Sequence, residues 1–338
     1  MENLTAPSPS ARLPSELLGY IFEIQNEMAW DDLEPCPTFH TSSVCKRWRD
    51  AALASPRAWT TITNLIFKKP SYKLEGPLNT LRLLLARSGE APLYAQVIAE
   101  SYMFNDEVNY FRRYIKEAVN LLQDQARRLK QLFIIYGTHD DDLLDSLVQM
   151  DTPILEVLMI KECADGTDHT IKGALAFAPL LRTLDWQGLP FTLASNPSPH
   201  LTTLNINGHV SLHPLHEKLG GFLEACPLLY SLVIDQNTSE ETSLNFEPPT
   251  FHLPQLHTLA INAVNLLLFR NTTSLHALRD LRLHGCDSSA EFETMLRFRH
   301  IHLLTCLRLQ YCHPTAEVMD EVFKVCGKTA VKIGAKPS

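Results

Sequence analysis

Residues 256–261 read Leu-His-Thr-Leu-Ala-Ile, which is leucine, two variable residues, leucine, one variable residue and a third apolar residue. This Leu-x-x-Leu-x-apolar pattern occurs eight times after residue 128, at steps of 26, 26, 20, 28, 27, 22 and 26 residues. Such near-even spacing is the signature of a chain built from stacked repeats. The eight units begin at Leu129, Leu155, Leu181, Leu201, Leu229, Leu256, Leu278 and Leu304.

This pattern is typical of leucine-rich repeats, in which each unit contributes one short strand to a parallel sheet. The ninth position is cysteine or asparagine in four units, as the repeat requires: Cys163, Asn237, Cys286 and Cys312. Between strands, stretches such as 141–150, 215–225, 290–298 and 316–325 have apolar residues at helical spacing. We therefore predict an α/β solenoid of about eight units over residues 129–326, with strands on the concave face and helices outside.

The composition indicates an ordinary globular protein. It is 45% apolar and 20% charged, and its net charge of −8 argues against a nucleic acid or an anionic membrane as partner. No apolar run reaches the roughly 18 residues of a membrane helix.

The eight cysteines are scattered and form no Cys-x-x-Cys pair. We expect reduced thiols and an intracellular protein, in the cytoplasm, the nucleus or both.

Residues 13–63 have a different pattern. Leu-Pro-Ser-Glu at 13–16 places proline and an acid where the first turn of a helix favours them. A second helical segment follows at 44–53, and Ser-Pro-Arg-Ala-Trp at 55–59 ends it. A unit this small buries too little apolar surface to be stable alone, so we expect its apolar stripes to meet a partner or the next domain. These stripes are Leu17, Leu18, Ile21 and Phe22 in the first helix and Val44, Cys45, Trp48 and Ala52 in the second.

Leu-Pro-x-Glu-Leu-Leu-x-x-Ile-Phe, Val-Cys-Lys-Arg-Trp-Arg-Asp and the closing Ser-Pro-x-x-Trp together resemble the F-box, particularly that of fungal F-box proteins with divergent leucine-rich repeats. The resemblance implies a three-helix module that binds a Skp-family adaptor and through it a cullin–RING ubiquitin ligase. The stretch 23–41 and Ala58 depart from the family pattern, and Trp59 is expected in the core. The adaptor contacts that the resemblance implies are Leu13, Pro14, Leu17, Leu18, Ile21, Phe22, Val44, Cys45 and Trp48.

The remaining segments complete the expected domain order. Residues 1–12 are predicted to be a disordered tail, 64–128 a helical connector that caps the first repeat, and 327–338 a C-terminal tail. Within the connector, 93–98 is a candidate strand, and 87–93 is similar to a recurrent segment of the fungal F-box proteins.

We find no pattern that indicates catalysis, and we predict no catalytic residue, no metal and no cofactor. His209, His213 and His216 have a spacing that zinc accepts, but Pro214 breaks the helix that would align them, which favours solvated histidines. The acidic run 140–142 lacks the spacing of a calcium loop. Phosphate-loop, dinucleotide and nucleophile-elbow motifs are absent from the sequence.

On each predicted strand, the side chains between the leucines point to the open face of the sheet. This face changes from apolar in the early units to partly basic in the last two, where Arg282 and Arg308 occupy equivalent positions. We hypothesise that this end accepts an acidic or phosphorylated segment of a protein client. Pairing with Asp280, or simple solvation, is the favoured alternative. The client-binding candidates are Phe133, Val157, Met159, Arg282, His284 and Arg308.

The sequence therefore predicts a non-catalytic substrate receptor of a Skp–cullin–F-box ligase, whose repeats bind an unidentified protein client. Two alternatives remain open. One is a scaffold whose F-box binds the adaptor without a ligase. The other is a hydrolase with a site in residues 64–128 and the irregular loops.

Overall fold

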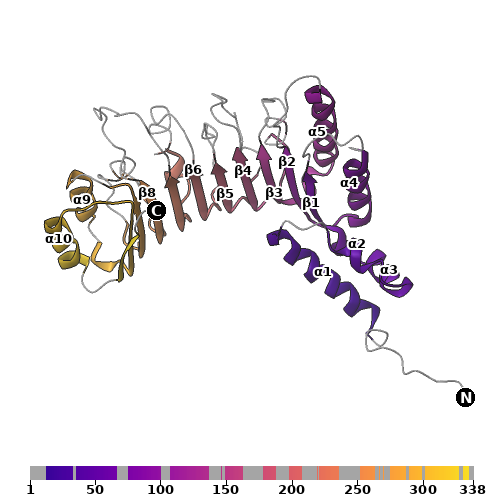
Figure 1. The fold of residues 1–338 in the computed structure, drawn as a ribbon, viewed down its shortest axis with the longest axis horizontal. Coiled ribbons are helices and arrows are strands. Elements are labelled where there is room, and N and C mark those ends of the chain that lie inside the picture. Colours follow the sequence, from indigo (N-terminus) through magenta and orange to yellow (C-terminus); the bar gives the residue numbers. More distant parts are fainter. Residues whose placement is uncertain are drawn as a thin grey trace, which may run out of the picture. The chain divides into compact units, whose positions relative to one another are not determined.

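The computed structural model describes residues 13–32, 36–66, 75–99, 107–136, 146, 149–162, 178–187, 198–207, 219, 221–235, 252–262, 266, 269, 275–286, 289–298, 301–326 and 330–334. The chain forms two compact units, Met1–Thr138 and His139–Ser338. Helices and strands alternate in the first unit, and a row of parallel strands dominates the second (Figure 1).

The first unit begins with a helical module and continues into three parallel strands. The module comprises α1 (Ser15–Asp32), α2 (Thr38–Thr41), α3 (Lys46–Leu53) and a 3-10 helix, η2 (Pro56–Trp59). The strands are β1 (Thr61–Ile66), β2 (Leu93–Ala99) and β3 (Leu129–Tyr136), with α4 (Glu75–Ser88), α5 (Glu107–Gln123) and η3 (Ala126–Arg128) between them. Strand β2 pairs in parallel with both β1 and β3.

The second unit is a run of eight parallel strands. They are β4 (Val157–Glu162), β5 (Thr183–Gln187), β6 (Thr203–Asn207), β7 (Ser231–Asp235), β8 (Thr258–Asn262), β9 (Asp280–His284), β10 (Cys306–Gln310) and β11 (Ala330–Gly334). Helices α9 (Ser289–Leu296), η5 (Ile301–Leu303) and α10 (Ala316–Cys326) lie on one side of the last strands (Figure 1).

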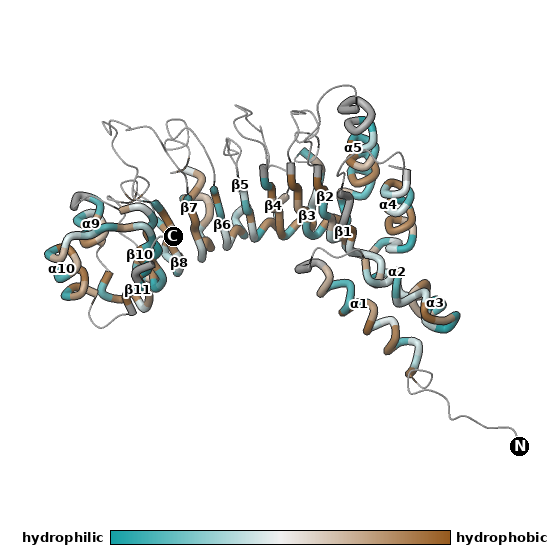
Figure 2. Tube along the Cα trace, in the orientation of Figure 1, coloured by the Kyte–Doolittle hydropathy of each residue, from teal (hydrophilic) through white to brown (hydrophobic). Residues whose placement is uncertain are grey.

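All eight predicted repeat strands are present, from β3 to β10. Residues alternate between buried and half-buried along them because successive side chains of a strand point to opposite faces. Figure 2 shows the corresponding alternation of hydrophobic and hydrophilic residues. The three apolar positions of every unit are at most 3% exposed, for example Leu229, Leu232 and Ile234. The strand pattern and its inward residues are therefore confirmed.

A repeated turn fixes the start of each strand. The amide of the first leucine donates to the carbonyl three residues earlier, as Leu181 does to Ala178 at 3.1 Å and Leu201 does to Ser198 at 3.1 Å. The unit that begins at Leu201 follows a step of only 20 residues, yet it starts with the same turn as the units on either side. Strands β5 and β6 pair without a shift in register. The boundary of this unit therefore follows the repeat.

The strand array begins earlier and ends later than expected. Strand β2 confirms the candidate strand 93–98 within the predicted connector 64–128. Strand β1 was not predicted, and the boundary at residue 63 falls inside it. The predicted C-terminal tail is wrong over Ala330–Gly334, which pairs with β10 as strand β11. Neither β1 nor β11 carries the leucine pattern, which is why the repeat did not reveal them.

The helical module also differs in its boundaries. Helix α1 continues to Asp32, ten residues past the predicted stripe, and α2 occupies part of the stretch expected to be irregular. Helix α3 begins at Lys46, with Cys45 as an extended N-cap residue, so Val44 and Cys45 precede the helix rather than form its first turn.

The segment 87–93 ties the module to the first strands. The Arg87 guanidinium lies over the Trp59 ring, 4.3 Å from its centroid. Arg128 donates to the Ser88 hydroxyl at 2.8 Å and to the Ala91 carbonyl at 2.9 Å. Gly89 between them has φ +53, which favours glycine over other residues. The segment 87–93 therefore contacts both the helical module and the residues just before β3.

Candidate functional site

Helix α1 has one buried face. Leu18, Phe22, Asn26 and Ala29 are at most 6% exposed and follow helical spacing. This face packs on α3 and η2. The Phe22 ring lies 5.7 Å from that of Trp48, at an interplanar angle of 58°. The buried face therefore holds α1 in place in the module.

The opposite face of α1 is apolar and exposed. Its side chains follow one another at steps of 3, 1, 3 and 4 residues and therefore share one helical stripe. We call this set the α1 stripe: Leu17 (49% exposed), Tyr20 (60%), Ile21 (37%), Ile24 (38%) and Met28 (65%). Exposed apolar patches of this kind mark interaction surfaces.

The predicted adaptor-binding residues differ in how exposed they are. Leu18 and Phe22 are fully buried, so the expectation that they contact a partner directly is corrected. Leu17 and Ile21 lie on the α1 stripe, whereas Leu13 and Trp48 are half-buried. The exposed remainder is Pro14, Val44 and Cys45.

Three residues of the stripe were not among the predicted contacts. Tyr20, Ile24 and Met28 continue the helical spacing of Leu17 and Ile21, and that spacing was the signal that could have revealed them. The first F-box-like motif ends at Phe22, so no later residue of this helix was assigned. Consecutive leucines also cannot show which of them faces the core.

A buried polar cluster fixes the orientation of the module. The Asn26 amide donates to the Thr60 hydroxyl at 3.2 Å, and the Cys36 thiol donates to the Asn26 carbonyl oxygen at 3.4 Å. Burial raises the pKa of the Cys36 thiol, which keeps its proton on the donor. The Trp59 indole donates to the Ala52 carbonyl at 2.7 Å and is fully buried, as expected for a core residue.

A depression of about 380 Å³ lies beside the α1 stripe. Gly19 is one of the residues that line it, and a Cβ atom there would lie 3.3 Å from the Ser55 Oγ atom. Ser55 donates to a Glu23 carboxylate oxygen at 2.8 Å. The start of α1 is held to α3 by Arg47, which donates to the Leu13 carbonyl. The lining residues are Ser15, Glu16, Gly19, Tyr20, Glu23, Ala51, Ala54 and Ser55.

The second candidate surface is the open face of the strands in the second unit. The client-binding candidates Val157, Met159, Arg282, His284 and Arg308 all lie on it and are half-buried. Phe133 lies on β3 in the first unit, beside Gln96 in the register of β2 and β3. The predicted set is thus split between the two units.

Arg282 and Arg308 are register partners on β9 and β10, as predicted. Arg282 donates to one Asp280 carboxylate oxygen through Nη2 at 2.8 Å and through Nε at 3.2 Å, which is the pairing favoured from the sequence. The Arg308 Nε atom lies 3.4 Å from the Cys306 Sγ atom, and this contact and Asp280 raise the pKa of Arg308. Arg308 therefore stays charged and extends from the strand face.

The sulfur of Cys312, a ninth-position residue, contacts backbone groups at the ends of two neighbouring strands. The Cys286 amide donates to the Cys312 sulfur at 3.3 Å, and the Cys312 thiol lies 3.3 Å from the Gln310 carbonyl oxygen. These bonds satisfy backbone groups where the strand turns away. Cys163 and Asn237 fall outside the described residues.

The described ranges contain no group of three metal-ligating side chains. The histidines 209, 213 and 216 and the acidic run 140–142 lie outside those ranges. Within the same ranges, every helix is too short or too polar to cross a bilayer.

No protein-family model matches the chain. No curated protein matches it either. A crystal structure of a Bacteroides fragilis protein is similar at 17% identity, with 74% of this chain and 76% of that chain covered and a TM-score of 0.48. A leucine-rich-repeat protein from Leptospira interrogans is similar at 13% identity, with 84% and 98% covered and a TM-score of 0.18. These values add nothing to what the strand repeat itself shows.

Proposed function

We propose that this protein is a non-catalytic substrate receptor of a Skp–cullin–F-box ubiquitin ligase. In this proposal the helical module binds the Skp-family adaptor and the solenoid binds a protein client. The observation that carries it is the α1 stripe, because an exposed apolar helix face needs a partner and lies in the segment that resembles the F-box.

The spacing of the stripe supports a helix-in-groove contact. Leu17, Ile21 and Ile24 recur at the steps by which an amphipathic helix enters an apolar groove. Val44, 64% exposed, and Leu53, 48% exposed, add apolar surface around α3. The buried cluster around Asn26 holds the helices in one arrangement before binding, which lowers the entropy cost of association.

The contribution to ubiquitin transfer would be proximity. Binding a client and a ligase through one chain raises the local concentration of client lysines near the transfer machinery. The chain itself supplies no reacting group in this mechanism.

The test is a titration of the full-length protein with a purified Skp-family adaptor. Leu17→Glu combined with Ile21→Glu places two carboxylates in the apolar contact, and we expect the Kd to rise at least about 100-fold, since buried interface anchors contribute about 2 kcal/mol or more each. The matched control is Leu83→Glu with Leu180→Glu, two exposed leucines elsewhere at 39% and 43%. Equal binding by wild type and the Leu17/Ile21 variant would refute adaptor recruitment by the stripe.

Reconstitution with the adaptor, a cullin and its RING subunit separates the receptor from the scaffold alternative. A receptor brings the cullin into one complex with the chain. If the adaptor binds and the cullin stays apart, the ligase-independent scaffold is the correct function.

A further inference from the structure

The last three strands place three cations in one row. Arg282 on β9 is the register partner of Arg308 on β10, and Arg308 is the register partner of Lys332 on β11. Neighbouring strands lie about 4.8 Å apart, so the three Cα atoms span roughly 10 Å. We call this row the cation ladder. Lys332 was absent from the sequence prediction because its segment was taken for a tail.

The ladder carries more positive charge than its surroundings neutralise. Asp280 pairs with Arg282, and the carboxylate of Asp235 lies 3.8 Å from the His284 Nδ1 atom. Within the described ranges, no carboxylate forms an ion pair with Arg308 or Lys332. Like charges directly opposite on neighbouring strands destabilise a sheet unless an anion lies between them. Among the described residues the row therefore keeps an excess of positive charge, because Asp280, which pairs with Arg282 and also acts electrostatically on Arg308, is a single carboxylate against three cations.

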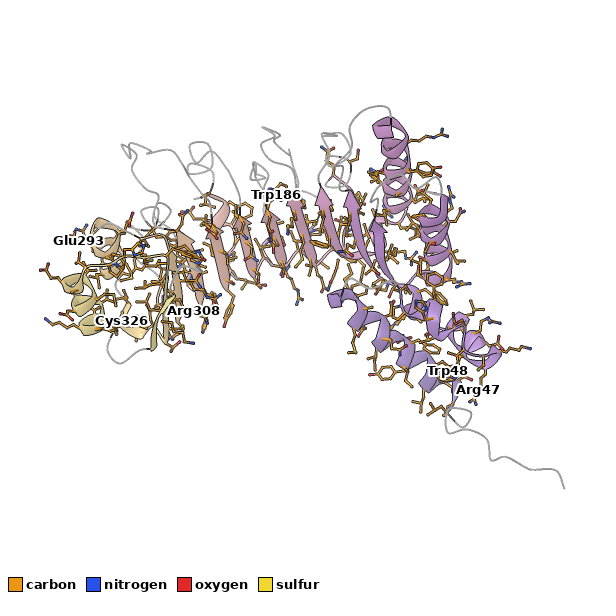
Figure 3. The ribbon with its side chains drawn as sticks, viewed as in Figure 1. Arg47, Trp48, Trp186, Glu293, Arg308 and Cys326 are labelled. Carbon is orange, nitrogen blue, oxygen red and sulfur yellow. The ribbon has the colours of Figure 1, made fainter. Side chains whose placement is uncertain are left out.

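The ladder faces away from the helices that cover the sheet. Leu307 and Leu309, on either side of Arg308, are fully buried on the opposite face. Figure 3 labels Arg308 on the strands, apart from Glu293 on α9 and Cys326 on α10. The Arg282 side chain is 38% exposed despite its ion pair, and Lys332 is exposed. An approaching ligand can therefore reach all three cations from one side.

We propose that the cation ladder binds an acidic segment of a protein, through carboxylate or phosphoryl groups that bridge Arg308 and Lys332. This inference rests on the proposed function, in which the segment belongs to the client. Asp280, Cys306 and Ala330 form the flanking row on one side, and His284, Gln310 and Gly334 form the row on the other, so Arg308 and Lys332 have no acidic neighbour two residues away on their own strands. Guanidinium groups bind such anions in a two-pronged geometry that adds specificity to the charge.

An extended acidic segment fits this row better than a single ion does. Alternate side chains on one face of an extended chain repeat at about 6.6–6.8 Å, so two acidic side chains fall within the roughly 10 Å of the ladder. The Arg282 guanidinium already donates to the Asp280 carboxylate, so Arg308 and Lys332 are the main anchors for the acidic segment.

The test is fluorescence anisotropy with the full-length protein and a labelled alternating Ser-Glu peptide that is long enough to cross three strands. Arg308→Gln with Lys332→Gln should raise the Kd about tenfold, because two partly exposed ion pairs contribute together about 1.4 kcal/mol. The matched control is Arg297→Gln with Lys324→Gln on the helix side, which changes the net charge by the same amount and should alter the Kd less than about twofold.

Further probes identify the anion. A phosphoserine peptide that binds more tightly than the Ser-Glu peptide assigns the site to phosphoryl groups, whereas equal binding assigns it to acidic side chains in general. A Ser-Gln peptide should not bind.

The proposal is overturned if the ladder variant binds the Ser-Glu peptide as wild type does, if the control loses as much affinity, or if oligothymidylate binds the ladder more tightly. Adaptor binding by the ladder variant is measured in parallel. A failure of the cation-ladder proposal can then be told apart from a failure of the proposed adaptor binding.

Discussion

At the scale of single residues, the helical module depends on polar side chains as much as on its apolar core. Asn26 is fully buried and contacts Thr60 and Cys36. We expect Asn26→Ala to lower the free energy of unfolding by about 1–3 kcal/mol, because it leaves buried donors and acceptors unpaired. Urea denaturation measures this loss, with Asn79→Ala on the exposed side of α4 as control. A change below about 0.5 kcal/mol for Asn26→Ala would contradict the assigned role.

Cys226 gives a residue-scale prediction with a pH dependence. Burial raises the pKa of its thiol from 9.0 to about 12. The unfolded thiol therefore loses its proton from about pH 9 while the folded one keeps it, so the contribution of Cys226 to stability decreases as pH rises from about 9 toward 12. We expect the stability of wild type, relative to Cys226→Ala, to fall by up to about 1.4 kcal/mol per pH unit in this window. Parallel curves for the two proteins would contradict the burial of the thiol.

At the scale of the element, each repeat strand has one face in the core and one face on the open side of the sheet. Leu232 on β7 is fully buried, and the next residue, Val233, is half-buried on the open face. We expect Leu232→Ala to cost about 2–5 kcal/mol and Val233→Ala less than about 1 kcal/mol. Guanidinium denaturation of the two variants tests the assignment of faces. A larger loss for Val233→Ala than for Leu232→Ala would mean that the two faces are exchanged, as a one-residue shift of the register would do.

At the scale of the whole molecule, the two proposed surfaces belong to separate compact units. We therefore expect their energetics to be additive, because sites without shared contacts do not couple. The Leu17/Ile21 variant should bind the Ser-Glu peptide with unchanged Kd, and the Arg308/Lys332 variant should bind the adaptor with unchanged Kd. Measuring both ligands on both variants checks this. A change above about threefold in either cross-measurement would indicate coupling between the surfaces.

The sequence by itself determined the strand array. The Leu-x-x-Leu-x-apolar repeat fixed eight strands and their inward residues because the spacing of side chains in a strand is set by backbone geometry alone. It also placed Arg282 beside Arg308, since equivalent positions of a repeat become register partners.

Only the tertiary structure decided which apolar residues of the helical module face outward. Leu17 and Leu18 are neighbours in sequence, but one is 49% exposed and the other fully buried, because the position of α3 and η2 selects the core face. It also decided that Ala330–Gly334 is a strand, which brings Lys332 beside Arg308. A strand at the end of a sheet is held by backbone hydrogen bonds to its neighbour and needs no apolar repeat in its own sequence. Its pairing is therefore seen only in the three-dimensional structure.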